Sequence, residues 1–235
     1  MQYGANTEGM PDKDNIVFHL VEEDNMKIID NYRDLSIGMY LDICEIDRRE
    51  DIEELHKQVQ IISMLTGETE ESIYDLPLDE YKTLALKTDY LRHPYEGEVL
   101  TAKEYRVGKW VLVPVSDYRK ITTAQYIDFQ SFSKEGEKRI VEVLSTMLVP
   151  KGKRYNQDYD VVELQKDLRL HLSVVDALTL FAFFFVQYNQ LIRDSLISCK
   201  EEAMRIPDKR KREQILKEIA RTEALLQKNG VGSHV

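Results

Sequence analysis

The chain has 235 residues, of which 43% are hydrophobic and 31% charged, an ordinary composition for a soluble globular protein of one sizeable domain or two small ones. The formal net charge of −10 is unevenly placed, because residues 1–100 hold 24 acidic and 9 basic residues while the remainder holds 18 and 23. An acidic front half argues against wrapping nucleic acid there. Two widely separated cysteines, Cys44 and Cys199, argue against a disulfide scaffold.

The first 15 residues contain no apolar stretch and no basic cluster, so we expect a loose arm there rather than a signal peptide. Residues 16–21 and 26–32 are rich in strand-forming residues and predict two short strands around a turn at residues 23–25. A helix is expected from Ser36 onwards, because serine is a favoured N-cap residue.

Residues 31–46 recur at residues 117–132, so an internal duplication organises the sequence. The identical pairs are Tyr32/Tyr118, Arg33/Arg119, Tyr40/Tyr126 and Asp42/Asp128. Thr122 takes the N-cap place of Ser36 and is expected to form a full capping box with Gln125. Leu35 and Ile121 precede the two caps, and Tyr40 and Tyr126 follow at the spacing of a hydrophobic staple. Both copies are therefore expected to turn from strand to helix in the same way.

The similarity continues through two more helices in each copy. Residues 60–67 and 143–152 each indicate the end of an amphipathic helix that stops at a glycine. The stretch from Leu78 to Leu91 predicts a third helix with one apolar face. The second copy should also have strands around a turn at Gly108, where Pro114 indicates an edge strand or a bulge.

The most apolar stretch, Leu172 to Ile192, predicts the third helix of the second copy, with Ser173 as its cap and Asp176 three residues on. A helix that is apolar on every side runs through a core, crosses a membrane or is covered by a partner. Polar residues bound the run before it reaches the roughly 20 residues that a bilayer requires, so we expect a buried helix. Its Ala177–Val186 part should be covered within the chain, and its Tyr188–Ile192 part by a partner.

This helix should continue to Arg205 and stop before Pro207, and a last amphipathic helix should run from Asp208 to Lys228. The predicted fold class is α+β, mainly α, with two copies of a strand-plus-three-helix unit around one buried apolar helix and a charged C-terminal helix. The expected divisions are a flexible arm at 1–15, a first repeat unit at 16–98, a second repeat unit at 99–206, and a C-terminal helix and tail at 207–235.

No catalytic or metal-binding pattern stands out, because the five histidines share no ligand spacing with each other or with the cysteines. Asp42 and Asp128 could form a carboxylate pair for acid–base chemistry if the duplication brings them together. We favour a structural role, in which Asp42 holds Arg33 and Asp128 holds Arg119, so that each pair ties a strand to its helix. We therefore predict no enzyme activity, no metal and no cofactor.

Three segments of the second copy, KITTAQYIDFQSF, LVPKGKRYNQDYD and LSVVDALTLFAFFF, combine a capped helix, a Pro-x-Gly-Lys-x-Tyr loop and an apolar helix. The first copy has LSIGMYLDICEI and MLTGETEESIYDLPLDEY in corresponding places. Over residues 31–192 the chain resembles small phage proteins of tail and morphogenesis modules, often called tail-assembly-chaperone-like. The motifs are structural, so the resemblance transfers no catalytic residues.

The resemblance implies a non-enzymatic bacteriophage protein that binds other phage proteins during tail or virion assembly. Expected partners are the tape measure, tail tube or neck subunits, or further copies of this chain, in the host cytoplasm during assembly and without nucleic acid or a membrane. The alternative is a structural subunit of the neck or tail that stays in the virion and has a large self-interface. In the two last helices, the residues expected to meet a partner are Tyr188, Leu191, Ile192, Ile215, Ile219 and Leu226.

Overall fold

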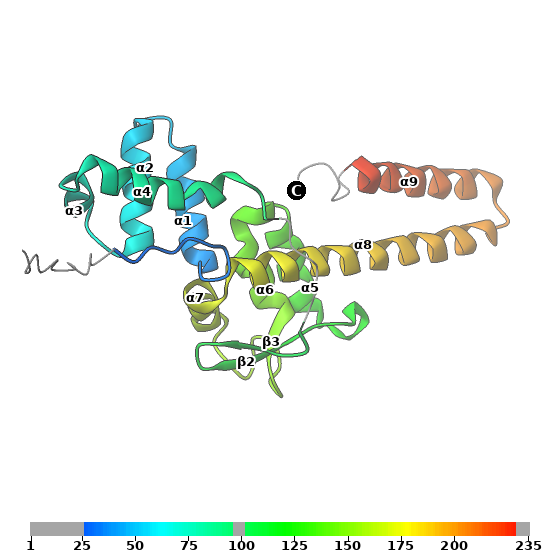
Figure 1. Cartoon of the computed structure of the whole chain (residues 1–235). Coiled ribbons are helices and arrows are strands. Elements are labelled where there is room, and N and C mark those ends of the chain that lie inside the picture. Colours follow the sequence, from blue (N-terminus) through cyan, green and yellow to red (C-terminus); the bar gives the residue numbers. More distant parts are fainter. Residues whose placement is uncertain (1–25, 96–101, 229–235) are drawn as a thin grey trace, which may run out of the picture.

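The computed structural model describes residues 26–95 and 102–228, with side chains as far as Ala224. These residues form a mainly helical fold with one small antiparallel sheet, as the predicted α+β, mainly α class requires. The described chain has three parts (Figure 1): a helical first lobe, a central body that carries the sheet, and a long helical hairpin that projects from the body.

The first lobe contains α1 (Ile37–Arg48), α2 (Glu54–Thr66), α3 (Glu70–Tyr74), α4 (Leu78–Lys87) and the 3-10 turn η1 (Asp89–Arg92). Ser36 starts α1 as predicted, because its hydroxyl accepts a hydrogen bond from the Met39 N–H (3.2 Å). α2 ends as predicted at Gly67, whose φ of 77° lies in the left-handed region that favours glycine. Two small apolar clusters hold the lobe together, one around Leu65 and one around Ile62.

The central body contains β1 (Tyr105–Val107), β2 (Trp110–Pro114), η2 (Tyr118–Lys120), α5 (Thr123–Ser133), η3 (Gly136–Arg139), α6 (Ile140–Met147), β3 (Leu148–Pro150) and α7 (Val161–His171). The strands pair in the order β1-β2-β3, so that Leu112 of β2 lies opposite Tyr105 on one side and Pro150 on the other. α6 forms the centre of the core, because every residue from Val143 to Met147 is buried.

The start of α8 (Val174–Met204) lies beside the start of α1, far apart in the sequence. The Ile37 N–H donates to the Leu172 carbonyl (2.8 Å), and the Val174 N–H donates to the Leu35 carbonyl (2.9 Å). Each bond satisfies an N–H that the first turn of a helix leaves without an internal partner. This bridge joins the first lobe to the body.

α8 then passes α6, leaves the body, and turns back through residues 205–208 into α9 (Lys209–Lys228) (Figure 1). Its cap is the predicted one, since the Ser173 hydroxyl accepts from the Asp176 N–H (3.1 Å). It also ends before Pro207 as predicted.

The predicted capping box at Thr122 is only half formed. The Thr122 hydroxyl accepts from the Gln125 N–H (3.1 Å), but the Gln125 amide donates to the Thr146 carbonyl instead of returning to the cap. Thr146 belongs to the last turn of α6, whose carbonyls lack helical partners, and it lies in the core where an unpaired carbonyl is costly. A tertiary contact therefore replaces the local one.

The predicted strand at residues 26–32 is wrong. The segment is irregular, and the Ile29 N–H donates to the Leu65 carbonyl at the end of α2 (3.2 Å), so it covers a helix end instead of pairing in a sheet. The companion strand predicted at residues 16–21 lies outside the described residues.

Pro114 is in the central strand β2, so the prediction of an edge strand is also wrong. The proline is tolerated because it is the last residue of β2, and β1 reaches only as far as Leu112. The neighbouring Val115 N–H bonds towards β3, at the Met147 carbonyl (2.9 Å), so position 114 faces the side where β1 has already ended.

The glycine stop expected within residues 143–152 is wrong as well, since α6 passes at Met147 directly into β3 and Gly152 lies in the turn beyond that strand. The turn predicted at Gly108 does join β1 to β2. The duplication and the boundaries of its two units stay a prediction.

Candidate interaction surfaces

The inner half of α8 is covered on one side. Ala177, Leu180 and Phe184 lie at helical spacing and are fully buried in the main core. Phe184 is the only buried side chain among the four phenylalanines of this helix, and the other three are half-buried. Val186 is 59% exposed, so the expectation that the chain covers all of Ala177–Val186 is wrong.

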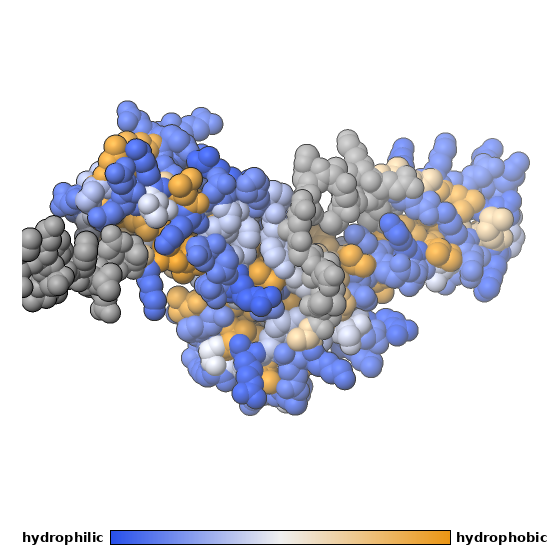
Figure 2. Space-filling view, in the orientation of Figure 1, coloured by the Kyte–Doolittle hydropathy of each residue, from blue (hydrophilic) through white to orange (hydrophobic). Residues whose placement is uncertain are grey.

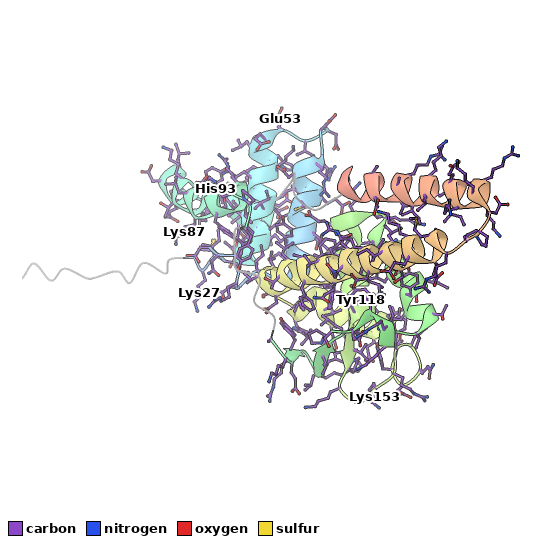
Figure 3. All side chains as sticks on the ribbon, turned by 90° about the vertical axis from the view of Figure 1, so that its right-hand side faces the viewer. Lys27, Glu53, Lys87, His93, Tyr118 and Lys153 are labelled. Carbon is purple, nitrogen blue, oxygen red and sulfur yellow. The ribbon has the colours of Figure 1, made fainter. Side chains whose placement is uncertain are left out.

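Aromatic side chains anchor α8 where it leaves the body. The Tyr118 hydroxyl donates to the Phe184 carbonyl (2.6 Å), and Tyr118 lies beside α8 in Figure 3. The Phe129 and Tyr188 rings lie 5.2 Å apart between centroids, and Gln130 donates to the Tyr188 hydroxyl (2.8 Å). Burial raises the pKa of Tyr118, as expected for a phenol placed away from water.

Beyond Ile192, α8 runs beside α9 as an antiparallel helical hairpin (Figure 1). Ala203 of α8 and Ile219 of α9 are almost fully buried, and Ile215 is half-buried. Lys200 forms an ion pair across the hairpin with Glu223 (2.6 Å). The two helices therefore cover part of each other's apolar surface.

The residues predicted to meet a partner lie mostly on this internal side. Tyr188 and Leu191 pack against the main core, and Ile219 is buried. Ile192 and Ile215 are half-buried, and the side chain of Leu226 lies outside the described residues. Their role in binding a partner stays a prediction, while the packing role of the first three is plain.

A different set of apolar residues is exposed on α8. Val186, Ile197 and Met204 are 59%, 55% and 65% exposed. They are 11 and 7 residues apart, which at 3.6 residues per turn places them on one face of the helix. Figure 2 shows hydrophobic residues along the hairpin among hydrophilic ones, with a hydrophilic far end. We call these three residues the α8 stripe. The helical spacing of these three residues can be read from the sequence. It is difficult to recognise, because the stretch that precedes it is apolar on every side of the helix.

The predicted pair Arg33–Asp42 is wrong. Asp42 on α1 forms its ion pair with Arg169 on α7, and Arg33 is exposed. α1 and α7 come very close here, since a Cβ on Gly38 would lie 2.5 Å from the Arg169 carbonyl oxygen. Asp42 therefore ties two helices together rather than a strand to a helix.

The predicted pair Arg119–Asp128 is wrong too. Asp128 accepts a hydrogen bond from the Tyr155 hydroxyl (2.9 Å), and Arg119 binds Asp117 two residues earlier (2.9 Å). The two aspartates of the duplication therefore have different partners, Arg169 for Asp42 and Tyr155 for Asp128.

A pocket of about 180 Å³ opens between α1, α2 and the end of the first lobe. Ile43, Ile61 and Leu91 line its apolar part, and Tyr40, Cys44, Asp47 and Glu54 are among its polar residues. Burial raises the pKa values of the Cys44 thiol and the Tyr40 phenol, so both keep their protons at neutral pH and neither is an activated nucleophile. Within residues 26–95 and 102–228, no group of three His, Cys, Asp or Glu side chains could hold a metal ion.

Among the described helices, α8 alone has the length and apolar composition to cross a membrane. The core helices of soluble proteins share this length and composition. Only 22% of the most apolar 18-residue window is buried within the chain, which agrees with the one-sided packing of this helix.

Comparisons with protein families, with curated proteins and with solved structures each gave no match to this chain.

Proposed function

We propose that this chain is a non-enzymatic protein that binds other phage proteins during tail or virion assembly, as a tail-assembly-chaperone-like factor. The observation that carries the binding role is the α8 stripe, Val186, Ile197 and Met204, exposed on a helix that projects from the body. Aligned apolar side chains on one helix face are a common anchor pattern in protein recognition. The phage assignment rests on the resemblance of the sequence motifs.

The test is co-expression of the full chain with a tape-measure, a tail-tube or a neck protein encoded beside it, followed by affinity purification. The wild-type chain is expected to retain at least one of the three. The variant Val186→Glu/Ile197→Glu should weaken that complex by about tenfold or more, because it places two charges against the partner's apolar surface.

A matched control is Val162→Glu/Leu170→Glu on α7, where the two apolar side chains are 57% and 65% exposed. This variant carries the same added charge and should leave the complex unchanged. If no candidate protein binds, or if both variants weaken binding equally, the proposal fails. Thermal unfolding of each variant checks that the fold is retained.

A structural virion subunit of the neck or tail is the second candidate, favoured by charges of opposite sign on the first lobe and the hairpin, which suit a ring of copies. Mass spectrometry of purified virions separates the two roles. A fixed copy number per particle supports the structural subunit, and absence from the particle supports the transient assembly factor.

A further inference from the structure

One end of the first lobe is strongly acidic. Residues 45–54, which join α1 to α2, hold six acidic and two basic residues, and all six acidic ones are exposed. Asp51 pairs with Arg49 (2.8 Å) and Glu54 with Lys57 (3.8 Å), whereas the other four acids form no ion pair with any described residue. In Figure 3, Glu53 marks this region at the outer end of the lobe. We call residues 45–54 the acidic end.

The tip of the hairpin is basic to the same degree. Residues 205–212 hold five basic residues and one acidic residue, a net charge of +4 against −4 for the acidic end. None of the five basic residues forms an ion pair with any described residue. The single acid, Asp208, is occupied as the cap of α9, since its carboxylate accepts from the N–H groups of Arg210 (2.8 Å) and Lys211 (3.2 Å). We call residues 205–212 the basic tip.

The two surfaces of one molecule cannot meet. α1 and α8 start at the same bridge, and they have 12 and 31 residues. At 1.5 Å per residue α1 is about 18 Å long and α8 about 46 Å, so the basic tip lies at least about 28 Å from the acidic end. Figure 1 shows the tip and the first lobe at opposite sides of the molecule. An ion pair requires atoms within about 4 Å, so these two surfaces can pair with each other only between molecules.

We propose that copies of this chain associate head to tail, with the basic tip of one copy docked on the acidic end of the next. The match of charge in sign and amount carries the proposal, together with the lack of ion pairs around most of these groups. Because the contact joins two different surfaces, it can continue from copy to copy into a ring or an open filament.

The pocket in the first lobe gives this docking a receiving site. Asp47 and Glu54 of the acidic end line it, together with the apolar side chains of Ile43 and Ile61. Arg92 lines it too, but its charge is offset by an ion pair with Asp89 (3.8 Å). A lysine or arginine side chain has an apolar stem and a cationic head, so it suits a pocket with both kinds of lining. Tyr40 also lines the pocket, and aromatic rings attract cations.

A nucleic acid is a weaker candidate for the basic tip. Glu201, Glu202 and Glu213 flank the tip along both helices, and the whole chain carries a net charge of −10. A polyanion would be repelled by these groups, whereas the acidic end of another copy presents a short, local patch.

The experiment is sedimentation velocity of the full chain, free of nucleic acid, over a range of concentrations and at two salt levels. Association is expected at about 50 mM salt and should weaken by about tenfold or more at about 500 mM, where screening is much shorter in range. The tip variant Arg210→Glu/Lys211→Glu should stay monomeric. The two glutamates stand in the first turn of α9, where negative charge stabilises a helix, so loss of association would not reflect unfolding.

The complementary variant is Glu45→Lys/Glu50→Lys, which reverses two charges of the acidic end and should also stay monomeric. An equimolar mixture of the two variants combines one unaltered tip with one unaltered acidic end, so a complex of two or more chains should reappear. Lys103→Glu/Lys134→Glu changes the net charge as much as the tip variant does, on exposed lysines of the body, and should associate as the wild type does.

A monomeric wild-type chain at about 50 mM salt would overturn the proposal. So would association that either charge reversal leaves intact, or a mixture that stays monomeric. Tip-dependent binding of a DNA fragment by a chain that does not self-associate would assign the basic tip to nucleic acid instead.

Discussion

Tyr118 and Tyr159 each place a phenol hydroxyl in the interior, but their surroundings differ. The Tyr118 hydroxyl donates to the Phe184 carbonyl (2.6 Å). The Tyr159 hydroxyl is buried and has no hydrogen-bond partner among the described residues. A buried hydroxyl stabilises the fold where it is hydrogen-bonded and destabilises it where it is not. Removing the hydroxyl should therefore change the stability of the protein in opposite directions at the two positions.

Tyr118→Phe is therefore expected to lower the free energy of unfolding by about 1 kcal/mol. Tyr159→Phe should leave it unchanged or raise it by up to about 1 kcal/mol, because the substitution removes an unpaired buried hydroxyl. Urea unfolding followed by circular dichroism measures both. Equal losses in the two variants would contradict this account of the interior.

Buried tyrosines also set the behaviour of the protein in alkali. Burial raises the pKa of Tyr159 to about 12, and it raises the pKa values of Tyr118 and Tyr155 as well. An unfolded tyrosine has a pKa of about 10, so both states stay protonated below that pH and stability does not change. Between about pH 10 and 12 the unfolded chain releases protons that the folded chain keeps, so stability falls.

The urea midpoint should accordingly be constant from about pH 8 to 9.5 and decline from about pH 10 upwards. The absorbance of tyrosinate at high pH should rise together with the loss of helical signal. A midpoint that stays constant to about pH 11.5 would show that these phenols ionise in the folded state.

At the scale of elements, α1 and α7 approach each other closely at Gly38. Gly38 has no side chain, and a Cβ there would lie 2.5 Å from the Arg169 carbonyl oxygen, which is backbone and cannot move alone. The same contact carries the ion pair between Asp42 and Arg169. The packing of these two helices therefore requires glycine at position 38.

Gly38→Ala is expected to destabilise the protein by about 1–3 kcal/mol, because the helices must separate to admit the methyl group. Gly136→Ala is a useful comparison, since nothing lies within 4 Å of its added Cβ and only its φ of 61° opposes the change. Thermal unfolding of both variants measures the difference. A Gly38→Ala protein as stable as the wild type would mean that α7 does not hold α1 closely.

The elements that could be predicted from the sequence are those with local signals. Ser36, Thr122 and Ser173 cap their helices as expected, and the long apolar helix ends before Pro207. The predictions that were wrong concern segments whose structure depends on residues far away in the sequence. Residues 26–32 have strand-like residues but meet a helix end instead of another strand.

The candidate site shows the same division. The sequence predicts that Asp42 holds Arg33 and Asp128 holds Arg119, but the observed partners, Arg169 and Tyr155, come from segments that no local pattern connects to them. The α8 stripe was missed for the opposite reason. An all-apolar stretch predicts burial, and only the body's position shows that Val186 emerges from the core while Phe184 does not.

For the whole molecule, stability should be unevenly distributed between the body and the hairpin. All residues from Val143 to Met147 of α6 are buried in the main core. Beyond Ile192, α8 runs beside α9, which provides much less apolar cover. The outer hairpin should therefore open as a separate unit, at lower free energy than the body.

Hydrogen exchange measured by mass spectrometry tests this distribution. Amides of Val143–Met147 should exchange slowest, and peptides from α9 and from α8 beyond Ile192 should exchange together, faster by about tenfold or more. Exchange of α9 as slow as that of α6 would show that the hairpin is held by contacts with another molecule, such as a neighbouring copy.

The bridge between the starts of α1 and α8 can form only late in synthesis, because its two sides are far apart in the sequence. The ion pair beside it, Asp42 with Arg169, spans 127 residues. At about 5–20 residues per second, the ribosome needs about 6–25 s to produce the second half of this contact after the first. For part of that interval the first lobe is complete but lacks the surface on which it docks, and the cluster around Leu65 still lacks Val174 of α8. Only the cluster around Ile62 consists entirely of first-lobe residues. The nascent first lobe, before the rest of the chain is made, is thus the form of this protein most exposed to aggregation.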